Sequence, residues 1–180
     1  YIFIFCPTLD LTGDYDELNN TLKTKVQKIK NFDENMINEI MKQQEEVIKE
    51  YGKSKSPDIL LLLDDTFDDP KFNRSQCLKT LAFRGRHAKI STILSGQKLS
   101  MMSTSCRNNL THMGMFRPGN YSELDFWVEE NVEKSKRKEF SKMFKEVWKT
   151  KYNFIFIDYL NADLNKRFRK GFSEPLKIEL

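Results

Sequence analysis

The sequence has few of the residues that build stapled or metal-held domains. Its three cysteines, Cys6, Cys77 and Cys106, are widely spaced and include no C-x-x-C pair. Its two histidines, His87 and His112, do not have the spacing of zinc ligands. These counts argue against a disulfide framework and against a zinc site, and they predict reduced intracellular thiols.

Long apolar runs and targeting segments are also absent. No apolar run approaches the roughly 20 residues of a membrane span, and no signal peptide is visible. With 31% charged residues and a negative mean hydropathy, the sequence predicts a soluble protein with no membrane contact. A net charge of +4 permits contact with nucleic acid without establishing it.

A complete phosphate loop is the third absence. Residues 52–54 spell GKS, the end of the pattern G-x-x-x-x-G-K-S/T, but Val47 stands where the first glycine belongs and Pro57 follows closely. We interpret 52–57 as a solvated linker. The chain begins with YIFIFCP, which resembles the middle of a core strand, and we therefore expect a fragment whose natural start lies upstream.

The most informative stretch runs from 57 to 97. An apolar run over 59–63 stops on Asp64 and Asp65, and a second apolar run over 90–94 ends shortly before Gln97. A strand buried on both faces must be nearly all apolar, so acids can appear only where it emerges. Two neighbouring parallel strands that each end in polar residues predict the working edge of an α/β nucleotide-binding sheet.

This pattern suggests a role for each polar residue. We interpret Asp64 and Asp65 as a Walker B pair, in which Asp64 holds a Mg²⁺ ion that bridges the terminal phosphates. Asp65 would accept a proton from the attacking water or orient that water. Gln97 would position the same water or report on the γ-phosphate. The alternative is a buried strand whose acids only cap the next helix.

Hydrophobic periodicity predicts the remaining elements and a single domain over 1–180. We expect a helix capped by Asp33, another over 74–84 closed by a left-handed Gly85, and a helical segment with a basic face over 122–151. That face is either solvated or a nucleic-acid surface. The other expected elements are strands over 1–7, 110–116, 153–160 and 176–180, a short strand or turn over 26–30, and loops over 8–18, 98–109 and 163–170.

A basic cluster, Arg84, Arg86 and His87, follows the helix predicted over 74–84. One interpretation is a basic helix end that complements the helix dipole. The other is a positive charge that stabilises phosphoryl transfer, in a neighbouring subunit if the protein forms an oligomer. The sequence leaves both interpretations open.

Taken together, these segments resemble the poxvirus-type genome-packaging ATPases of the FtsK/HerA branch of P-loop NTPases, which occur in large DNA viruses and virophages. ILLLLDD is similar to the family's Walker B strand, and LAFRGRHAKISTILSGQ is similar to its helix, Gly-Arg-His turn, strand and sensor glutamine. YIFIFCPTLDLTGDYDEL resembles the strand and loop that follow the phosphate-loop helix, and NFIFIDYL resembles the strand that closes the core. RNNLTH resembles a later family segment, which here contains Arg107, Asn109, Thr111 and His112.

The resemblance implies a RecA-like P-loop NTPase core, with a mainly parallel central sheet flanked by helices, from which the first strand, P-loop and helix are missing. It implies ATP and Mg²⁺ as cofactors, a homo-oligomeric ring, double-stranded DNA as substrate and a capsid or portal vertex as partner. The expected location is the host cytoplasm, in a viral factory, or the virion. Arg86 and Arg107 are both candidates for the arginine that reaches a neighbour's γ-phosphate, and Lys98 and Arg107 are the expected DNA contacts, made to phosphates without base readout.

Two departures from the family pattern modify these expectations. Without a phosphate loop and its lysine, we expect this chain alone to bind nucleotide poorly and to be inactive. Asp65 stands where wider superfamily members often carry Glu, so a water relay or a local backbone shift is expected there. Two other functions remain open: a catalytically degenerate RecA-like assembly module, and a HerA-like translocase that works in DNA repair.

Overall fold

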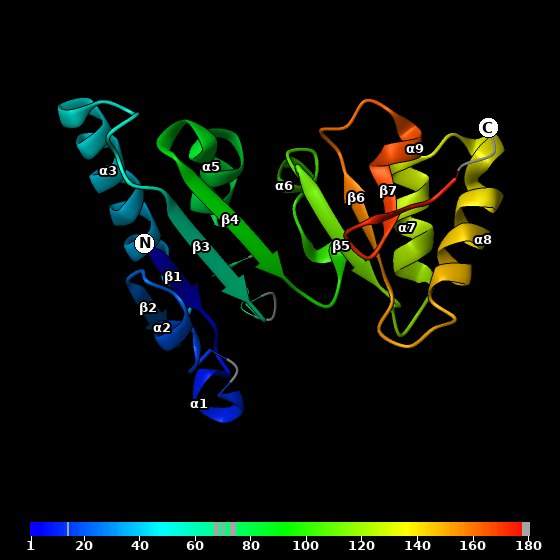
Figure 1. Cartoon of the computed structure of the whole chain (residues 1–180), viewed down its shortest axis with the longest axis horizontal. Coiled ribbons are helices and arrows are strands. Elements are labelled where there is room, and N and C mark those ends of the chain that lie inside the picture. The colour runs from blue at the N-terminus through cyan, green and yellow to red at the C-terminus, as the bar shows by residue number, and fades with distance from the viewer. Residues whose placement is uncertain (14, 67–68, 70, 73–74, 178–180) are drawn as a thin grey trace. The chain divides into compact units, whose positions relative to one another are not determined.

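Figure 1 shows the computed structural model of the chain, which describes all residues except 14, 67–68, 70, 73–74 and 178–180. The chain divides into two compact units. The first comprises Tyr1–Gln97 and Met101–Asn109, and the second comprises Lys98–Ser100 and Leu110–Leu180. Each unit has its own sheet and its own hydrophobic core. The interpretation of 1–180 as one ATPase domain stays a prediction.

The first unit contains a four-stranded sheet in the order β2-β1-β3-β4, and all of its strands run parallel. The strands are β1 (Ile2–Phe5), β2 (Val26–Ile29), β3 (Ile59–Asp64) and β4 (Ile90–Ser95). The predicted parallel α/β sheet is thereby confirmed, and the segment over 26–30 is a strand. Because the strands are parallel, the carboxyl ends of β3 and β4 lie at the same edge of the sheet.

Two helices pack on one face of this sheet. Helix α3 (Glu34–Tyr51) begins after Asp33, whose Oδ1 accepts the Met36 N–H at 3.0 Å, as predicted. Helix α5 (Gln76–Arg84) begins after Ser75; residue 74, where the prediction began, lies outside the described residues. Apolar side chains of both helices pack with alternate residues of β1, β3 and β4 in one core. This core fixes the position at which β3 leaves the protein interior.

The sequence predicted that β3 is buried on both faces, but the structure buries one face more than the other. Leu61 and Leu63 are fully buried under the helices, whereas Leu60 and Leu62 are half-buried. On the same side of β4, Ile93 is 51% exposed. An apolar sequence run therefore identified the strand correctly but overestimated how much of its second face the described residues cover.

The prediction of a left-handed Gly85 is wrong. Gly85 has φ −49° and ψ −46°, and the chain continues from α5 into a 3₁₀ helix, Gly85–Ala88. The left-handed residue is Lys89, with φ 55°. Glycine nevertheless suits position 85, because a Cβ there would lie 3.0 Å from the Ile90 carbonyl oxygen, closer than most Cβ contacts in proteins. Glycine is favoured here because the backbone of Ile90 passes close to its Cα, which is a second common reason for a glycine besides a left-handed conformation.

The predicted loop over 8–18 is helical in part. Two short helices, α1 (Leu9–Thr12) and α2 (Leu18–Thr21), follow β1. Ion pairs tie this segment to the neighbouring strand β2, with Lys28 Nζ 2.7 Å from Asp16 Oδ1, and to the residue after β2, with Lys30 Nζ 2.7 Å from Asp10 Oδ2. The segment is therefore anchored beside the carboxyl end of β1.

The second unit has a four-stranded antiparallel sheet in the order β5-β6-β7-β8. Its strands are β5 (His112–Phe116), β6 (Phe154–Asp158), β7 (Phe168–Lys170) and β8 (Glu174–Pro175). The segment NFIFIDYL therefore pairs within this second sheet. The prediction of a loop over 163–170 is wrong in part, because α9 (Leu164–Arg167) and β7 occupy it. The strand β8 ends one residue before the strand expected over 176–180, of which 178–180 lie outside the described residues.

Two helices pack on this sheet, α7 (Ser122–Asn131) and α8 (Arg137–Val147), with a short 3₁₀ helix, Lys134–Lys136, between them. Trp127, Phe144 and Trp148 form the aromatic centre of the core, with the Trp127 and Phe144 ring centroids 5.0 Å apart. The buried indole N–H of Trp148 donates to the Met115 carbonyl at 3.1 Å, which ties α8 to the sheet. The remaining short elements are the 3₁₀ helix Leu99–Met101 and α6 (Thr104–Arg107).

Candidate functional site

Asp64 is the last residue of β3 and is held by groups that follow β1. The Tyr15 hydroxyl donates to Asp64 Oδ2 at 2.7 Å, and the Cys6 thiol lies 3.6 Å from the same oxygen. Cys6 Sγ in turn lies 3.2 Å from the Thr8 hydroxyl. These groups meet because β1 and β3 are neighbouring parallel strands, with Phe5 opposite Leu63. Asp64 is therefore a half-buried carboxylate with a fixed orientation.

Asp65 adopts the left-handed backbone conformation, with φ 51°. Aspartate tolerates this region better than most residues, because its short polar side chain can bond locally. The next residue, Thr66, is 1% exposed, and its hydroxyl has no hydrogen-bond partner among the described residues. Backbone strain and an unpaired buried hydroxyl both follow the strand directly, and such features are commoner at functional sites than elsewhere.

Gln97 follows β4, the strand next to the acids, two residues beyond its carboxyl end. In the register of β3 and β4, Asp64 is opposite Ser95, so Gln97 follows that pair by two residues. Its side chain is exposed. The structure thus places Asp64, Asp65 and Gln97 at one edge of a parallel sheet, at or just beyond the carboxyl ends of two adjacent strands.

Arg86 lies at the opposite edge of the sheet. It precedes β4, whose first residue, Ile90, is opposite Ile59 at the start of β3. The six residues of β3 separate the two edges by about 16 Å, at 3.3 Å per residue. Lys53 of the GKS segment lies at this amino edge too, because its Nζ donates to the Arg86 carbonyl at 3.3 Å. The structure does not bring Arg86 or this segment together with the acids of the same chain.

Arg107 ends the short helix α6, which packs beside α5 at the carboxyl end of β4. Residues of α6 and of the segment before it share a small cavity with Leu94 of β4 and Leu78 of α5. The Arg107 guanidinium donates to the Met102 carbonyl, and its Nη2 lies 3.3 Å from the Thr104 hydroxyl. Arg107 therefore belongs to the same edge as the acids, in contrast to Arg86. Lys98, the other expected DNA contact, is exposed and directly follows Gln97.

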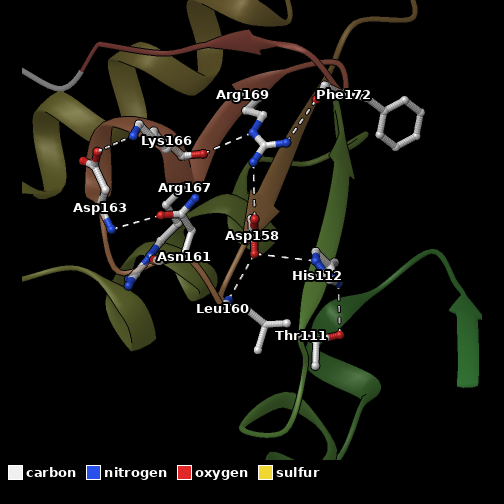
Figure 2. A network of polar contacts seen from close by, with 10 residues as sticks. All are labelled: Thr111, His112, Asp158, Leu160, Asn161, Asp163, Lys166, Arg167, Arg169 and Phe172. Atoms are coloured by element: carbon white, nitrogen blue, oxygen red, sulfur yellow. Dashed lines mark hydrogen bonds and ion pairs between the residues drawn. The ribbon is translucent and has the colours of Figure 1, made fainter. Parts of the chain in front are cut away.

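The remaining residues of the RNNLTH segment belong to two different networks. The Asn109 side chain donates to the Ser105 carbonyl at 2.8 Å. His112 belongs to a cluster in the second unit, where Asp158 is central (Figure 2): His112 Nε2 lies 3.5 Å from Asp158 Oδ1, and Arg169 Nη2 lies 3.3 Å from Oδ2. Thr111 hydroxyl lies 3.1 Å from the other ring nitrogen of His112. This cluster connects β5, β6 and β7.

Sequence reasoning missed Tyr15, Cys6 and Thr8. Thr8 and Tyr15 lie in the segment over 8–18, which was predicted only as a polar loop, and Cys6 lies just before it. No sequence spacing links these residues to Asp64. One signal was present: Cys6 and Thr8 directly follow the first strand of an α/β sheet, the position from which parallel sheets present functional side chains. Tyr15 could be found only from the three-dimensional fold, since 49 residues separate it from Asp64.

Among the described residues, none of the helices combines the length and the apolar character needed to cross a bilayer. The sequence matches none of the curated proteins with which it was compared. Solved structures do resemble it. The genome packaging NTPase B204 from Sulfolobus turreted icosahedral virus 2, in complex with ATP-gammaS, is 14% identical with a TM-score of 0.58, over 98% of this chain and 82% of that chain.

The same protein in complex with sulfate gives a TM-score of 0.60 at 12% identity, with 98% and 82% of the two chains covered. B204 described as the DNA-packaging ATPase from Sulfolobus turreted icosahedral virus gives 0.58 at 14% identity, with 98% and 83% covered. These likenesses show that the chain shares the α/β fold of B204. A family model described as Poxvirus A32 protein matches residues 1–168. The predicted family is thereby confirmed: the chain belongs to the poxvirus A32 protein family.

Proposed function

We propose that this chain supplies the hydrolytic edge of an ATP-driven motor that packages double-stranded DNA. The observation that carries the proposal is the position of Asp64, Asp65 and Gln97 at the carboxyl ends of two adjacent parallel strands. Open parallel sheets bind their ligands at this edge. The family and the likeness to viral packaging NTPases support the same reaction.

The donor set at Asp64 fits a magnesium ion. Mg²⁺ prefers oxygen ligands and retains several waters, so one fixed carboxylate beside nucleotide phosphates suits it. Tyr15 occupies Asp64 Oδ2, which leaves Oδ1 as the oxygen that would hold the metal. When bound, the ion would neutralise charge on the transferred phosphoryl group. Asp64 would orient it, directly or through a water.

Asp65 is the proposed general base or water-orienting group. Its backbone is left-handed, with φ 51°, directly after β3. Gln97, on the adjacent strand, would orient the attacking water by hydrogen bonding. These proposed roles are supported by the geometry of the edge and by the family, and each can be tested by substituting the residue.

Two residues, Arg86 and Arg107, are candidates for the arginine that reaches a neighbour's γ-phosphate. Arg86 lies about 16 Å from the acids of its own chain by strand length, so it could act only on a neighbouring chain of a ring. Arg107 lies at the acid edge and forms hydrogen bonds with its own loop, so it would have to exchange those bonds for phosphate contacts. Lys98 and Arg107 remain the proposed DNA contacts of this loop, and DNA-free hydrolysis separates the two roles of Arg107.

The test is ATP hydrolysis by the intact protein with Asp65→Asn, with Asp58→Asn as a matched control. Asn keeps the tolerance for the left-handed backbone but cannot accept a proton. We expect hydrolysis to fall by about 100-fold or more, the usual effect of removing a general base. Asp58 precedes the same strand at its other end and is 85% exposed, so its variant should keep full activity.

Other results would favour the alternatives. A folded, oligomeric wild-type protein without hydrolysis would indicate the assembly module. Hydrolysis that requires a DNA end and accompanies strand separation would indicate a repair translocase. For the packaging role, we propose a homo-oligomeric ring, a capsid or portal vertex as partner, and action in the host cytoplasm or the virion.

A further inference from the structure

The positive charge of the chain is concentrated in one segment. Residues 134–151 contain eight Lys or Arg and two Glu, a net charge of +6, while the whole chain has a net charge of +4. The rest of the chain is therefore slightly negative. A charge this unevenly distributed creates a local field that the net charge alone does not reveal.

Helix α8 arranges this charge on one exposed side. Lys138, Lys142 and Lys145 are spaced by four and three residues, which places them in one row along α8. Lys149 continues the spacing two residues beyond the end of the helix at Val147. All four are exposed. The opposite side of α8 carries the buried Phe140, Phe144 and Val147, which pack in the core of the second unit. The core therefore holds in place the helix that carries the lysines.

Few carboxylates neutralise this row directly. Lys149 pairs with Glu146 at 2.7 Å, and both side chains are largely exposed, so the pair contributes little. Lys145 Nζ lies 4.6 Å from the Tyr121 ring centroid. The ion pairs among the described residues include neither Lys138 nor Lys142. At least two of the four charges are thus available to an outside anion.

The four lysines, together with Glu146, line one wall of a groove of about 600 Å³ between α7 and α8. Its α7 wall carries Asp125 and Glu129, so an anion would be repelled from that wall and attracted to the α8 row. Arg137 fixes the two helices to each other, because its Nη2 donates to the Glu129 carbonyl at 3.0 Å and its Nε to the Val132 carbonyl at 3.2 Å. The binding surface for an anion is therefore the α8 side of this groove, which the four lysines line.

We infer that this lysine row binds the phosphate backbone of double-stranded DNA, independently of sequence. The three lysines within α8 span about 10 Å of the helix at 1.5 Å per residue, and Lys149 extends the row beyond its end. Duplex DNA presents one charge per roughly 1.7 Å of its axis. Several phosphates therefore lie within reach of four flexible ammonium groups, which bind phosphate as point charges. The inference takes DNA as the partner from the proposed function, and it assigns a surface distinct from Lys98 and Arg107.

The experiment measures DNA affinity of the intact protein over a range of salt concentrations. The variant Lys138→Gln/Lys145→Gln is compared with Lys42→Gln/Lys49→Gln on α3, which removes the same charge from two exposed lysines with the same seven-residue spacing. Because each phosphate contact contributes about 0.9 to the slope of log K against log salt, the α8 variant should lose about two units of slope. The α3 variant should match the wild type, and DNA-free hydrolysis should be unchanged in both.

Each outcome decides between supporting and overturning the inference. Equal slopes for the α8 variant and the wild type overturn it while leaving the proposed function intact. Unchanged DNA binding with lost binding of polyglutamate also overturns it, because the surface would then serve an acidic polypeptide. A wild-type protein that binds no DNA overturns both the inference and the DNA-packaging part of the proposed function.

Discussion

The two units of the molecule use charge in different ways. The first contains fifteen Lys or Arg and fifteen Asp or Glu, whereas the second contains fifteen and eleven, so the whole net charge of +4 belongs to the second. The first unit places Asp64 and Asp65 at one edge of a parallel sheet. The second spreads lysines along the outside of a helix that packs on an antiparallel sheet.

This contrast follows from the geometry of the two sheets. Parallel strands bring their carboxyl ends to one edge, so residues far apart in sequence, such as Tyr15, Asp64 and Gln97, converge there. Antiparallel strands alternate their ends and create no such edge. In the second unit the lysine row proposed to bind DNA lies instead on the exposed side of α8, whose opposite side packs in the core.

The largest expected effect comes from removing one core at a time. Leu61→Ala acts on the first core and Phe144→Ala on the second; both side chains are fully buried. Each should lower the free energy of unfolding by about 2–5 kcal/mol, from lost burial and the remaining cavity. Hydrogen exchange measured by mass spectrometry should show lost protection mainly within the substituted unit. Equal loss in both units would contradict the separation into two cores.

A smaller effect uses the cysteines, because all three lie in the first unit and all are buried. Burial raises the pKa of the Cys77 thiol to about 11, with a nearby Ser75 hydroxyl partly opposing the shift. Relative to an unperturbed thiol with a pKa near 8.5, the thiolate at pH 8 is rarer by about two orders of magnitude. Alkylation of Cys77 should therefore be slow at pH 8 and increase as the pH rises toward 11.

The same measurement distinguishes the units. Leu61→Ala should accelerate alkylation of the cysteines, whereas Phe144→Ala should not, since the second unit contains none. Acceleration of Cys77 alkylation by Phe144→Ala, or fast alkylation in the wild type, would show that the first core does not protect its thiols independently.

The smallest effect concerns the group that holds Asp64. Tyr15→Phe removes the hydroxyl that donates to Asp64 Oδ2 at 2.7 Å. Loss of such a supporting bond typically weakens metal binding by about tenfold. We expect the Mg²⁺ concentration for half-maximal hydrolysis to rise by that factor, while the rate at saturating Mg²⁺ changes little. Tyr51→Phe, at an exposed tyrosine on α3, is the control. An unchanged Mg²⁺ requirement would show that Tyr15 does not position the carboxylate.

The sequence was sufficient for the parts of the fold that depend on local pattern. The apolar runs before Asp64 and before Gln97 predicted two adjacent parallel strands, and Asp33 predicted the start of α3. These features depend on periodicity and capping, which a single sequence displays directly. The acid edge is likewise predictable, because an acid can follow a buried strand only where that strand emerges.

Other features depend on contacts between distant residues. Nothing near Tyr15 indicates a bond to Asp64, and the constraint on Gly85 comes from the Ile90 carbonyl, to which the turn returns. The short strand β7 was interpreted as a loop because its residues are mostly basic. Its pairing with β6 is decided by tertiary packing, in which Phe168 joins the second core.

The most direct test of the acid edge is to locate the metal. The intact protein would be crystallised, or imaged by cryo-electron microscopy, with Mg²⁺ and a non-hydrolysable ATP analogue. The account predicts a metal ion within about 2.1 Å of Asp64 Oδ1, or one bridging water away, with Asp65 and Gln97 facing the γ-phosphate. A nucleotide bound elsewhere, with Asp64 still held by Tyr15 and facing no metal, would contradict it.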